Sequence, residues 1–241
     1  MVDWENTFKE IEDARPEIAV LPVGALEQHS TFMPVGTDFL MTAHIARRVA
    51  DELDAYLLPA IPFGNSQEHQ DFFGTIWLRP STLARVVKDV CQALKHHGIR
   101  KVLIINGHGG NWILKPTVRE INLGDPEMTV ILSGAGTLAA TLKGSKIELH
   151  SGEIETSRMM EVFPHLVKAE QRRDFQPDVD REYLDYVGLR AVSPTGVWGT
   201  PSRANRKKGK KAIDDMVRYL VDYARDTFAR VEQIKSKRRR K

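Results

Sequence analysis

The sequence predicts an α/β fold in which two layers of helices cover a mostly parallel central sheet. Short apolar runs, such as 18–24 and 101–106, are typical of buried strands, and amphipathic segments such as 39–53 lie between them. Alternation of strands and helices favours parallel strands that are covered on both faces. The chain has 241 residues, of which 41% are hydrophobic, and this is enough for one full hydrophobic core. We therefore expect a single domain over residues 1–234.

The elements can be assigned in chain order from periodicity and from cap residues. Residues 3–13 carry large apolar side chains at helical spacing, which predicts a short helix packed on an edge of the domain. Ser81 occupies the N-cap position of a later helix, which Gly98 should end. The other predicted strands are 18–24, 56–61, 101–106 and 128–132, and the other predicted helices are 39–53, 116–123, a short one ending near 163, and 207–234. Loops are expected at 62–80 and 164–204, while residues 134–152 follow no clear pattern.

The composition indicates a cytoplasmic protein with no membrane partner. No apolar run reaches the roughly 18 residues that a membrane span needs, and the charged N-terminal stretch has no signal-peptide core. The single cysteine excludes an internal disulfide, which fits a reducing compartment. Because Cys91 borders the apolar face of a predicted helix, we interpret it as a core thiol rather than a nucleophile.

The C-terminal region is strongly basic. Residues 203–241 hold 15 Lys and Arg against 5 Asp and Glu, although the whole chain has a net charge of only +3. A solvated helix followed by a disordered basic tail at 235–241 explains this pattern. A nucleic-acid contact is the alternative, but no aromatic side chain is interleaved with the tail to stack on bases. We therefore expect no nucleic-acid partner.

The first predicted strand leads into a loop that carries metal-ligand residue types. Glu27 and His29 are two residues apart, so in an extended chain both side chains point the same way. With Asp38 they offer two carboxylates and an imidazole, a set that suits a divalent transition metal. The alternative is a surface turn in which Asp38 caps the next helix and His29 is solvated. The spacing alone does not decide between the two.

A glycine-rich loop follows the third predicted strand. His108 stands within the segment 107–111, where the glycines let the backbone come close to a bound group. A phosphate-binding turn is the alternative, but Trp112 stands where the dinucleotide pattern needs its third glycine, and the Walker pattern is absent. Since ligands bind beyond the carboxyl ends of the strands in open parallel sheets, we expect His108 to meet the residues of the first loop.

Five segments, in the same order along the chain, resemble the motifs of the creatininase family. They are LPVGALEQHSTFMPVGTD at 21–38, GNSQEHQDFFGTIWLRPSTL at 64–83, NGHGGN at 106–111, HSGEIETS at 150–157 and TGVWGTPSRANRKKG at 195–209. The resemblance covers roughly residues 15–215. It implies a creatininase-like three-layer α/β/α fold.

The resemblance also implies a metal-dependent amidohydrolase with two divalent ions per subunit. In this family a hydroxide that bridges the ions attacks the amide. The ligands carried over by motif are Glu27, His29, Asp38 and His108. Asp38 would be shared by both ions. Creatinine-cleaving members have a glutamate ligand where this chain has Gly110, so we expect Glu155 to supply the missing ligand or to act in catalysis. Mixed nitrogen and oxygen ligands leave Zn, Mn and Fe open.

Two further sets of residues are implied for catalysis and for substrate binding. His150 matches the family's motif histidine, and we expect it to protonate the leaving nitrogen or to contact the substrate; a helix cap or a core histidine is the alternative. Ser66, Glu68 and His69 lie in the segment that resembles the family's substrate-lining loop. We expect them to bind substrate, the alternative being a polar surface loop.

The expected substrate is a small molecule with a cyclic amide or formamide C–N bond. No tryptophan stands between Trp112 and Trp198, the region in which creatinine-cleaving members hold the ring, and this argues against creatinine itself. A formamidopyrimidine deformylase and a cofactor-maturation peptidase are alternatives within the family. A non-catalytic metal- or nucleotide-binding protein is the alternative from another class. Because family members are commonly hexamers, we expect a homo-oligomer.

Overall fold

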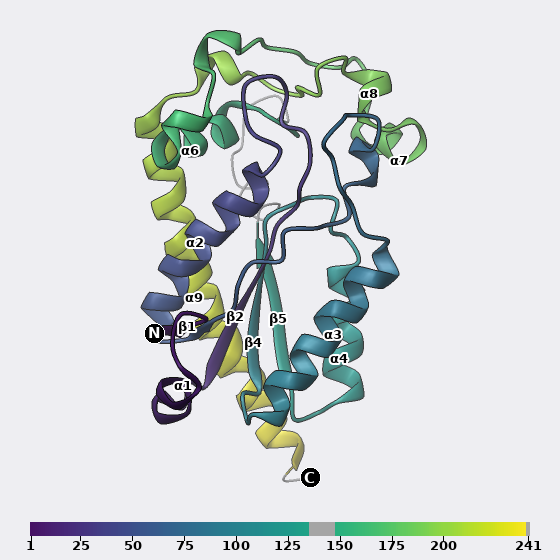
Figure 1. Ribbon diagram of the computed structural model, residues 1–241. Helices are drawn as coiled ribbons and strands as arrows, with labels where there is room; N and C mark the ends of the chain where they lie inside the picture. The colour runs from purple at the N-terminus through teal and green to yellow at the C-terminus, as the bar shows by residue number, and fades with distance from the viewer. Residues whose placement is uncertain (135–147, 240–241) are drawn as a thin grey trace.

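The central sheet has five parallel strands in the order β1-β3-β2-β4-β5 (Figure 1). The computed structural model describes residues 1–134 and 148–239. The strands are β1 (Val2–Asp3), β2 (Ile18–Val23), β3 (Tyr56–Leu57), β4 (Lys101–Asn106) and β5 (Thr129–Gly134). β4 pairs along its whole length with β2 on one side and with β5 on the other. The predicted parallel sheet is confirmed.

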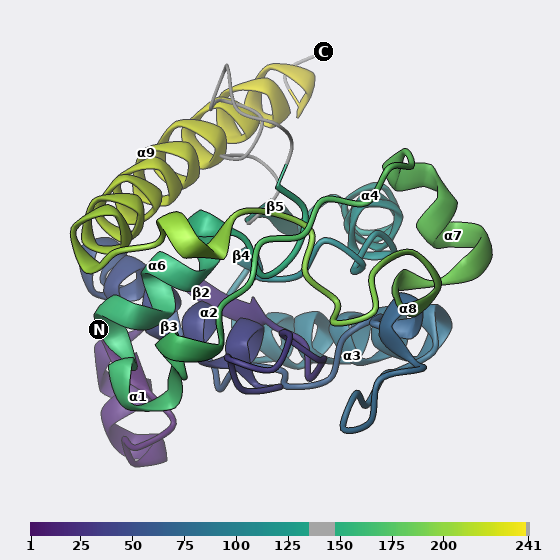
Figure 2. The ribbon, with the colours of Figure 1, turned by 90° about the horizontal axis from the view of Figure 1, so that it is seen from above.

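Helices cover both faces of this sheet. On one face lie α2 (Thr37–Leu53) and α9 (Arg206–Arg239), and on the other lie α3 (Pro80–His96) and α4 (Leu114–Gly124), as Figures 1 and 2 show. In the described part of the chain every helix is too short or too polar to span a membrane. The three-layer α/β/α architecture is as predicted.

Alternate residues of the central strands point into the two layers, as the pleat of a strand requires. Val20, Leu103 and Ile105 belong to the hydrophobic core on the side of α2 and α9. Leu21 and Ile104 belong to the core on the side of α3 and α4. Because both faces of β2 and β4 are buried, their sequences are continuously apolar rather than alternating.

The remaining elements are short and lie mostly at the end of the sheet where the strands finish (Figure 1). They are α1 (Phe8–Ala14), η1 (Gln67–His69), α6 (Glu153–Val162), η2 (Pro164–Leu166), η3 (Ala169–Gln171), η4 (Arg181–Tyr183), α7 (Leu184–Val187), α8 (Leu189–Val192) and η5 (Pro201–Arg203). Residues 164–204 thus contain only single turns of helix, as expected. Residues 135–147, part of the stretch without a clear pattern, lie outside the described residues.

Prolines move two of the predicted boundaries. The strand predicted over 56–61 pairs regularly only at β3, because Pro59 has no N–H to donate to a ladder; pairing resumes as a single bridge between Ile61 and Val23. α3 begins at Pro80, whose fixed backbone suits the first helical position. The N-cap residue is therefore Arg79, and the prediction of Ser81 as the cap is wrong.

The two ends of the chain also differ from prediction. No residue of α1 is buried, and Phe8 is 82% exposed, so Phe8 does not pack on the domain, whereas Ile11 is half-buried. At the other end α9 continues to Arg239, so residues 235–239 are helical rather than a disordered tail. The Lys235 ammonium helps to hold this end, since it donates hydrogen bonds to the backbone oxygens of Pro126 and Met128.

The crossing of α6 and α9 depends on a glycine, and this gives a first prediction. A Cβ atom on Gly209 would lie 1.9 Å from the backbone oxygen of Ser157. Gly209→Ala should therefore lower the free energy of unfolding by about 1–3 kcal/mol, although alanine normally favours a helix. Gly124→Ala in α4, where a Cβ meets nothing within 4 Å, is the matched control. Equal stability of the two variants in urea unfolding would contradict the tight crossing.

Candidate metal centre

The loops that follow β2 and β4 meet at the point where the connections after two neighbouring strands go to opposite faces of the sheet. β2 is followed by α2 on one face, and the neighbouring β4 is followed by α4 on the other face. In a doubly wound sheet this divergence opens a crevice beyond the carboxyl ends of the strands, which is the usual place for a ligand. Asn111 braces the crevice, because its side chain accepts a hydrogen bond from Asn65 N and donates one to Gly24 O.

Eight acidic and imidazole side chains gather in this crevice, and all of them were expected from the sequence. They are Glu27, His29, Asp38, Glu68, His69, His108, His150 and Glu155. The four histidines are each at most 9% exposed. Ser66, which we expected to bind substrate, is fully buried, and its hydroxyl makes no hydrogen bond within residues 1–134 and 148–239.

The carboxylate of Asp38 lies between two histidines. Its Oδ1 is 3.4 Å from His29 Nε2, and its Oδ2 is 3.3 Å from His108 Nδ1. Asp38 stands in the first turn of α2, where the helix dipole favours a negative charge. It is not the helix cap, because the N-cap residue is Gly36. The alternative of a solvated surface turn is therefore wrong, since Asp38 and His29 are both buried.

Glu27 and Glu155 extend this arrangement on either side of Asp38. Glu27 Oε2 is 2.9 Å from His108 Nδ1, and Glu155 Oε2 is 3.6 Å from His29 Nε2. Glu27 Oε2 and His29 Nε2 are buried atoms without a hydrogen bond among the described residues, so they lie close to these neighbours but are not aligned with them as donor and acceptor. A buried polar atom without a partner is costly unless a ligand completes it.

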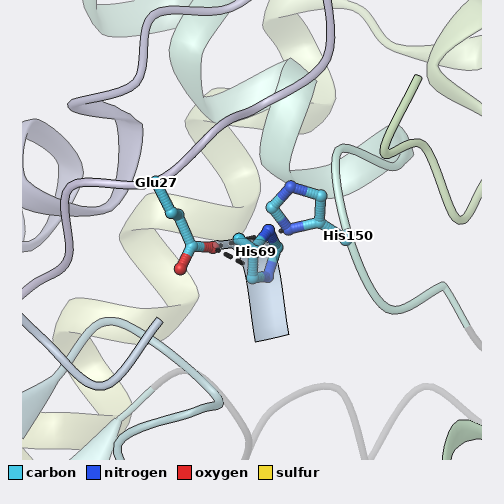
Figure 3. A group of neighbouring side chains, drawn as sticks. All are labelled: Glu27, His69 and His150. Atoms are coloured by element: carbon cyan, nitrogen blue, oxygen red, sulfur yellow. Dashed lines mark ion pairs between the residues drawn. The ribbon is translucent and has the colours of Figure 1, made fainter. Parts of the chain in front are cut away.

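Gln28 fixes the orientation of two more histidines. Its Oε1 accepts a hydrogen bond from Ser30 N, so its Nε2 must be the donor to His69 Nδ1 at 3.0 Å. His69 then carries its own proton on Nε2, which faces Glu27 Oε1 at 3.6 Å. His150 Nε2 lies 2.7 Å from the backbone oxygen of Gln28 and 3.0 Å from Gln28 Nε2. The shorter contact is to an oxygen that can only accept, so we assign the proton of His150 to Nε2, and Nδ1 faces Glu27 Oε1, also at 3.6 Å (Figure 3).

Burial and the neighbouring charges divide the histidines into two kinds. Burial opposes a proton on His29 and His108, but the surrounding carboxylates outweigh it and raise the pKa of both rings well above the usual value. His69 and His150 have no such excess of carboxylates, so burial and the other imidazoles lower their pKa, that of His150 to about 4. Burial also opposes the charge on Asp38, yet His29 and His108 hold its pKa below the usual range.

Glu68 approaches the far side of the His108 ring. Its Oε1 lies 3.4 Å from His108 Nε2, which is also 3.2 Å from the backbone oxygen of Asn65. Gly110 leaves room for this contact, because a Cβ there would lie 2.2 Å from Glu68 Oε1 and 2.3 Å from His108 Nε2. A carboxylate on the outer nitrogen of an imidazole is the arrangement that commonly orients metal-binding histidines.

The donor set fits divalent metal ions. Two ligand atoms held about 2.1 Å from one ion at a tetrahedral angle are about 3.4 Å apart. The two separations from Asp38, 3.4 Å to His29 and 3.3 Å to His108, match this value, and the 3.6 Å between His29 and Glu155 is close to it. The buried atoms of Glu27 and His29 that lack hydrogen bonds are also what ligand atoms require. Groups of three possible ligands recur in the described residues, including one of Glu27, His29 and Asp38.

Comparison with known proteins agrees with this geometry. The family model of Creatininase, described as creatinine amidohydrolase, matches residues 4–224. The chain belongs to the creatininase family. Creatinine amidohydrolase from Pseudomonas putida is 29% identical to it, with 93% of this chain and 96% of the relative covered. Mycofactocin precursor peptide peptidase from Mycobacterium tuberculosis is 30% identical, with 89% of this chain and 88% of the relative covered.

A more distant relative and several solved structures extend the comparison. The 2-amino-5-formylamino-6-ribosylaminopyrimidin-4(3H)-one 5'-monophosphate deformylase of Methanocaldococcus infernus is 26% identical, with 90% of this chain and 95% of the relative covered. A crystal structure of creatinine amidohydrolase has a TM-score of 0.81 at 28% identity, with 94% of this chain and 98% of that chain covered. Creatininases of a Zn–Zn type and with Mn have TM-scores of 0.79 and 0.81 at 27% identity. They cover 93% and 94% of this chain, and 96% and 98% of their own.

These findings confirm the resemblance read from the motifs and the activity that it implies. The chain is a creatininase-family metal-dependent amidohydrolase, like the creatinine amidohydrolase and the deformylase named above, which hydrolyse C–N amide bonds. Sequence reasoning did not identify Gln28 or Asn111 as parts of the site. Both stand inside the quoted family motifs, at Glu27-Gln28-His29 and in NGHGGN. Their presence as polar residues within these motifs was the signal that could have identified them as parts of the site.

The tight approach of Gly110 to the centre gives a second prediction. Gly110→Ala should displace Glu68 and His108 and weaken divalent-metal binding about 10- to 100-fold, the usual effect of disturbing such supporting contacts. The neighbouring Gly109→Ala is the matched control, because a Cβ there meets nothing within 4 Å. The metal affinity of both variants is measured by titrating the metal and monitoring thermal unfolding at each concentration. Equal metal affinity of Gly110→Ala and the wild type would show that this close approach does not matter.

Proposed function

We propose that the crevice binds two divalent metal ions, with Asp38 as the ligand that both share. Glu27 and His108 complete the first set of ligands. His29 and Glu155 complete the second. The observation that carries the proposal is the position of Asp38, whose two oxygens face different histidines at 3.4 and 3.3 Å. Such a carboxylate is suited to two ions held close together.

Glu155 is the one member of this ligand set that is not among the ligands carried over from the family motifs. Its Oε2 already accepts a hydrogen bond from Ser151 N at 2.7 Å, which aims the carboxylate at His29. Nearby Gly110 has no side chain to offer, so no other carboxylate approaches His29 Nε2 within 4 Å apart from Asp38 in the described residues. This supports Glu155 as the substitute for the glutamate ligand of creatinine-cleaving relatives.

The chain's own residues supply the proton transfer. When bound, the two ions would activate a water molecule and polarise the amide carbonyl. At neutral pH the buried His150 ring is uncharged, since its pKa is about 4, and Nδ1 faces the centre with a free lone pair. His150 therefore accepts the proton of the attacking water and passes it to the leaving nitrogen. His69, with its proton directed at Glu27, is suited to orient that carboxylate or a substrate carbonyl.

The proposed substrate is a small molecule that carries a cyclic amide or formamide C–N bond. Relatives that cleave creatinine, a peptide precursor and a formylaminopyrimidine support this breadth. Deformylase and cofactor-maturation peptidase activities remain the alternatives within the family. The Zn–Zn and Mn forms of solved relatives support zinc or manganese, and the ligand types also suit iron.

We also propose a cytoplasmic homo-oligomer. The single cysteine supports a reducing compartment. Large apolar side chains are exposed on the loop after β3, where Phe73 is fully exposed and Ile76 and Trp77 are 51% and 38% exposed. Exposed apolar groups of this size are typical of contact surfaces.

A substrate panel with defined metal loading tests the proposed function. The chain is stripped of metal, restored with Zn, Mn or Fe, and assayed on creatinine, cyclic amides, formamidopyrimidines and short peptides. We expect turnover of a cyclic amide or formamide only after metal is restored. His150→Gln should lower kcat about 10²- to 10⁴-fold while metal content stays the same. His165→Gln, on an exposed histidine, is the control.

Two outcomes would contradict the proposal. One is a chain that holds two ions and turns over no member of the panel. The other is a His150→Gln variant as active as the His165→Gln control.

A further inference from the structure

Helix α6 directs two charged side chains toward the end of the sheet. Glu155 faces the metal-binding crevice, and three residues later Arg158 lines a narrow cavity between α2, α6 and α9. Asp38 and Glu155 line the same cavity, so it adjoins the proposed catalytic centre. The cavity also reaches Asn106 at the end of β4. A group bound at Arg158 would therefore lie next to the residues that act on the amide.

The Arg158 guanidinium has no anionic partner in contact. Its Nε is buried without a hydrogen bond, and no ion pair joins Arg158 to any carboxylate among residues 1–134 and 148–239. Glu155 acts on it electrostatically without forming a hydrogen bond, and Glu155 is already engaged by His29 and Ser151. An arginine keeps its charge at all ordinary pH values, so this is a half-buried cation without an ion-pair partner among the described residues.

The other walls of the cavity make this charge more unfavourable. Met41, Ile45, Met216 and Leu220 line the side away from the crevice. Apart from the weakly accepting sulfur atoms of the two methionines, they offer no hydrogen-bond acceptor to a guanidinium. Burying an unpaired charge costs several kcal/mol. A side chain in that position is therefore more readily explained by a ligand than by a contribution to folding.

We propose that Arg158 binds an oxyanion, a carboxylate or phosphate group, of the substrate, so that the enzyme acts on anionic amides. The inference rests on the proposed function, because it places a second part of the same substrate beside the same centre. The guanidinium matches a carboxylate or phosphate with two parallel hydrogen bonds. The narrow cavity admits a small group of this kind rather than a polymer. Asp38 and Glu155, which would repel a free anion, are the residues whose charge bound metal would offset.

Direct binding of small anions tests the subsite without any turnover. Inorganic phosphate and acetate are titrated calorimetrically into the metal-loaded chain, and the two probes distinguish a phosphate from a carboxylate preference. Arg158→Gln keeps a polar side chain up to the Cδ position and removes the guanidinium and its charge, and we expect it to weaken binding of the preferred anion about 10- to 100-fold. Arg119→Gln, on an exposed arginine of α4, should bind as the wild type does. Metal content is measured for each variant so that loss of metal is not mistaken for loss of the subsite.

Stability separates this role from a structural one. If Arg158 serves a ligand, Arg158→Gln should unfold at the same or a higher denaturant concentration than the wild type, because a half-buried charge without an ion-pair partner is removed. A clear loss of stability would assign Arg158 to the fold and overturn the proposal. Arg158→Lys keeps the charge but loses the two parallel hydrogen bonds, so it should bind the anion with intermediate affinity.

A pair of substrates links the subsite to catalysis. Where the panel yields an active amide, a neutral form and a form bearing a carboxylate or phosphate are compared. Arg158→Gln should lower kcat/KM for the anionic form about 10-fold or more and leave the neutral form nearly unchanged. An equal loss for both forms, or equal anion binding by Arg158→Gln and the wild type, would overturn the subsite and leave the amidohydrolase intact. Anion binding that depends on Arg158 in a chain without amidase activity would instead refute the proposed function and keep the subsite.

Discussion

The structure depends on one buried carboxylate, that of Asp38, held between His29 and His108. Two features of the fold have to coincide for this to happen. β2 and β4 must be neighbours, so that the loops after them meet. α2 must begin just after the first loop, so that Asp38 stands in its first turn rather than at its cap. The helix then contributes a favourable field to the same carboxylate that the two rings contact.

So many titratable groups in one buried crevice oppose folding unless they neutralise one another. Without metal, the raised pKa values of His29 and His108 keep protons on the two rings next to the carboxylates. Divalent ions would replace those protons, because a ring nitrogen must be deprotonated to bind a metal. Glu68 contacts the ring of His108, and Gln28 contacts the neighbouring ring of His69. The charged groups of the crevice are thus explained by a function and not by a contribution to stability. The same explanation applies to Arg158, one turn further along α6.

The layered fold and the first half of the site could be predicted, because strand–helix alternation fixes parallel strands and brings their carboxyl ends together. Glu27 and His108 follow adjacent strands, and topology alone places them at one edge. Topology could not place His69 or Glu155, since His69 lies within the long loop at 62–80 and Glu155 follows no predicted strand; only the family motifs pointed to them. Arg158 carries no signal in the sequence, because an arginine on a helix is ordinarily solvated and only its burial sets it apart.

The central claim is that Asp38 joins two metal ions, and anomalous diffraction from crystals of the Zn- or Mn-loaded chain tests it most directly. We expect two anomalous peaks per chain, both within bonding distance of Asp38. One peak should contact Glu27 and His108, and the other should contact His29 and Glu155. A single peak among Glu27, His69 and His150, the competing group of possible ligands, would contradict it.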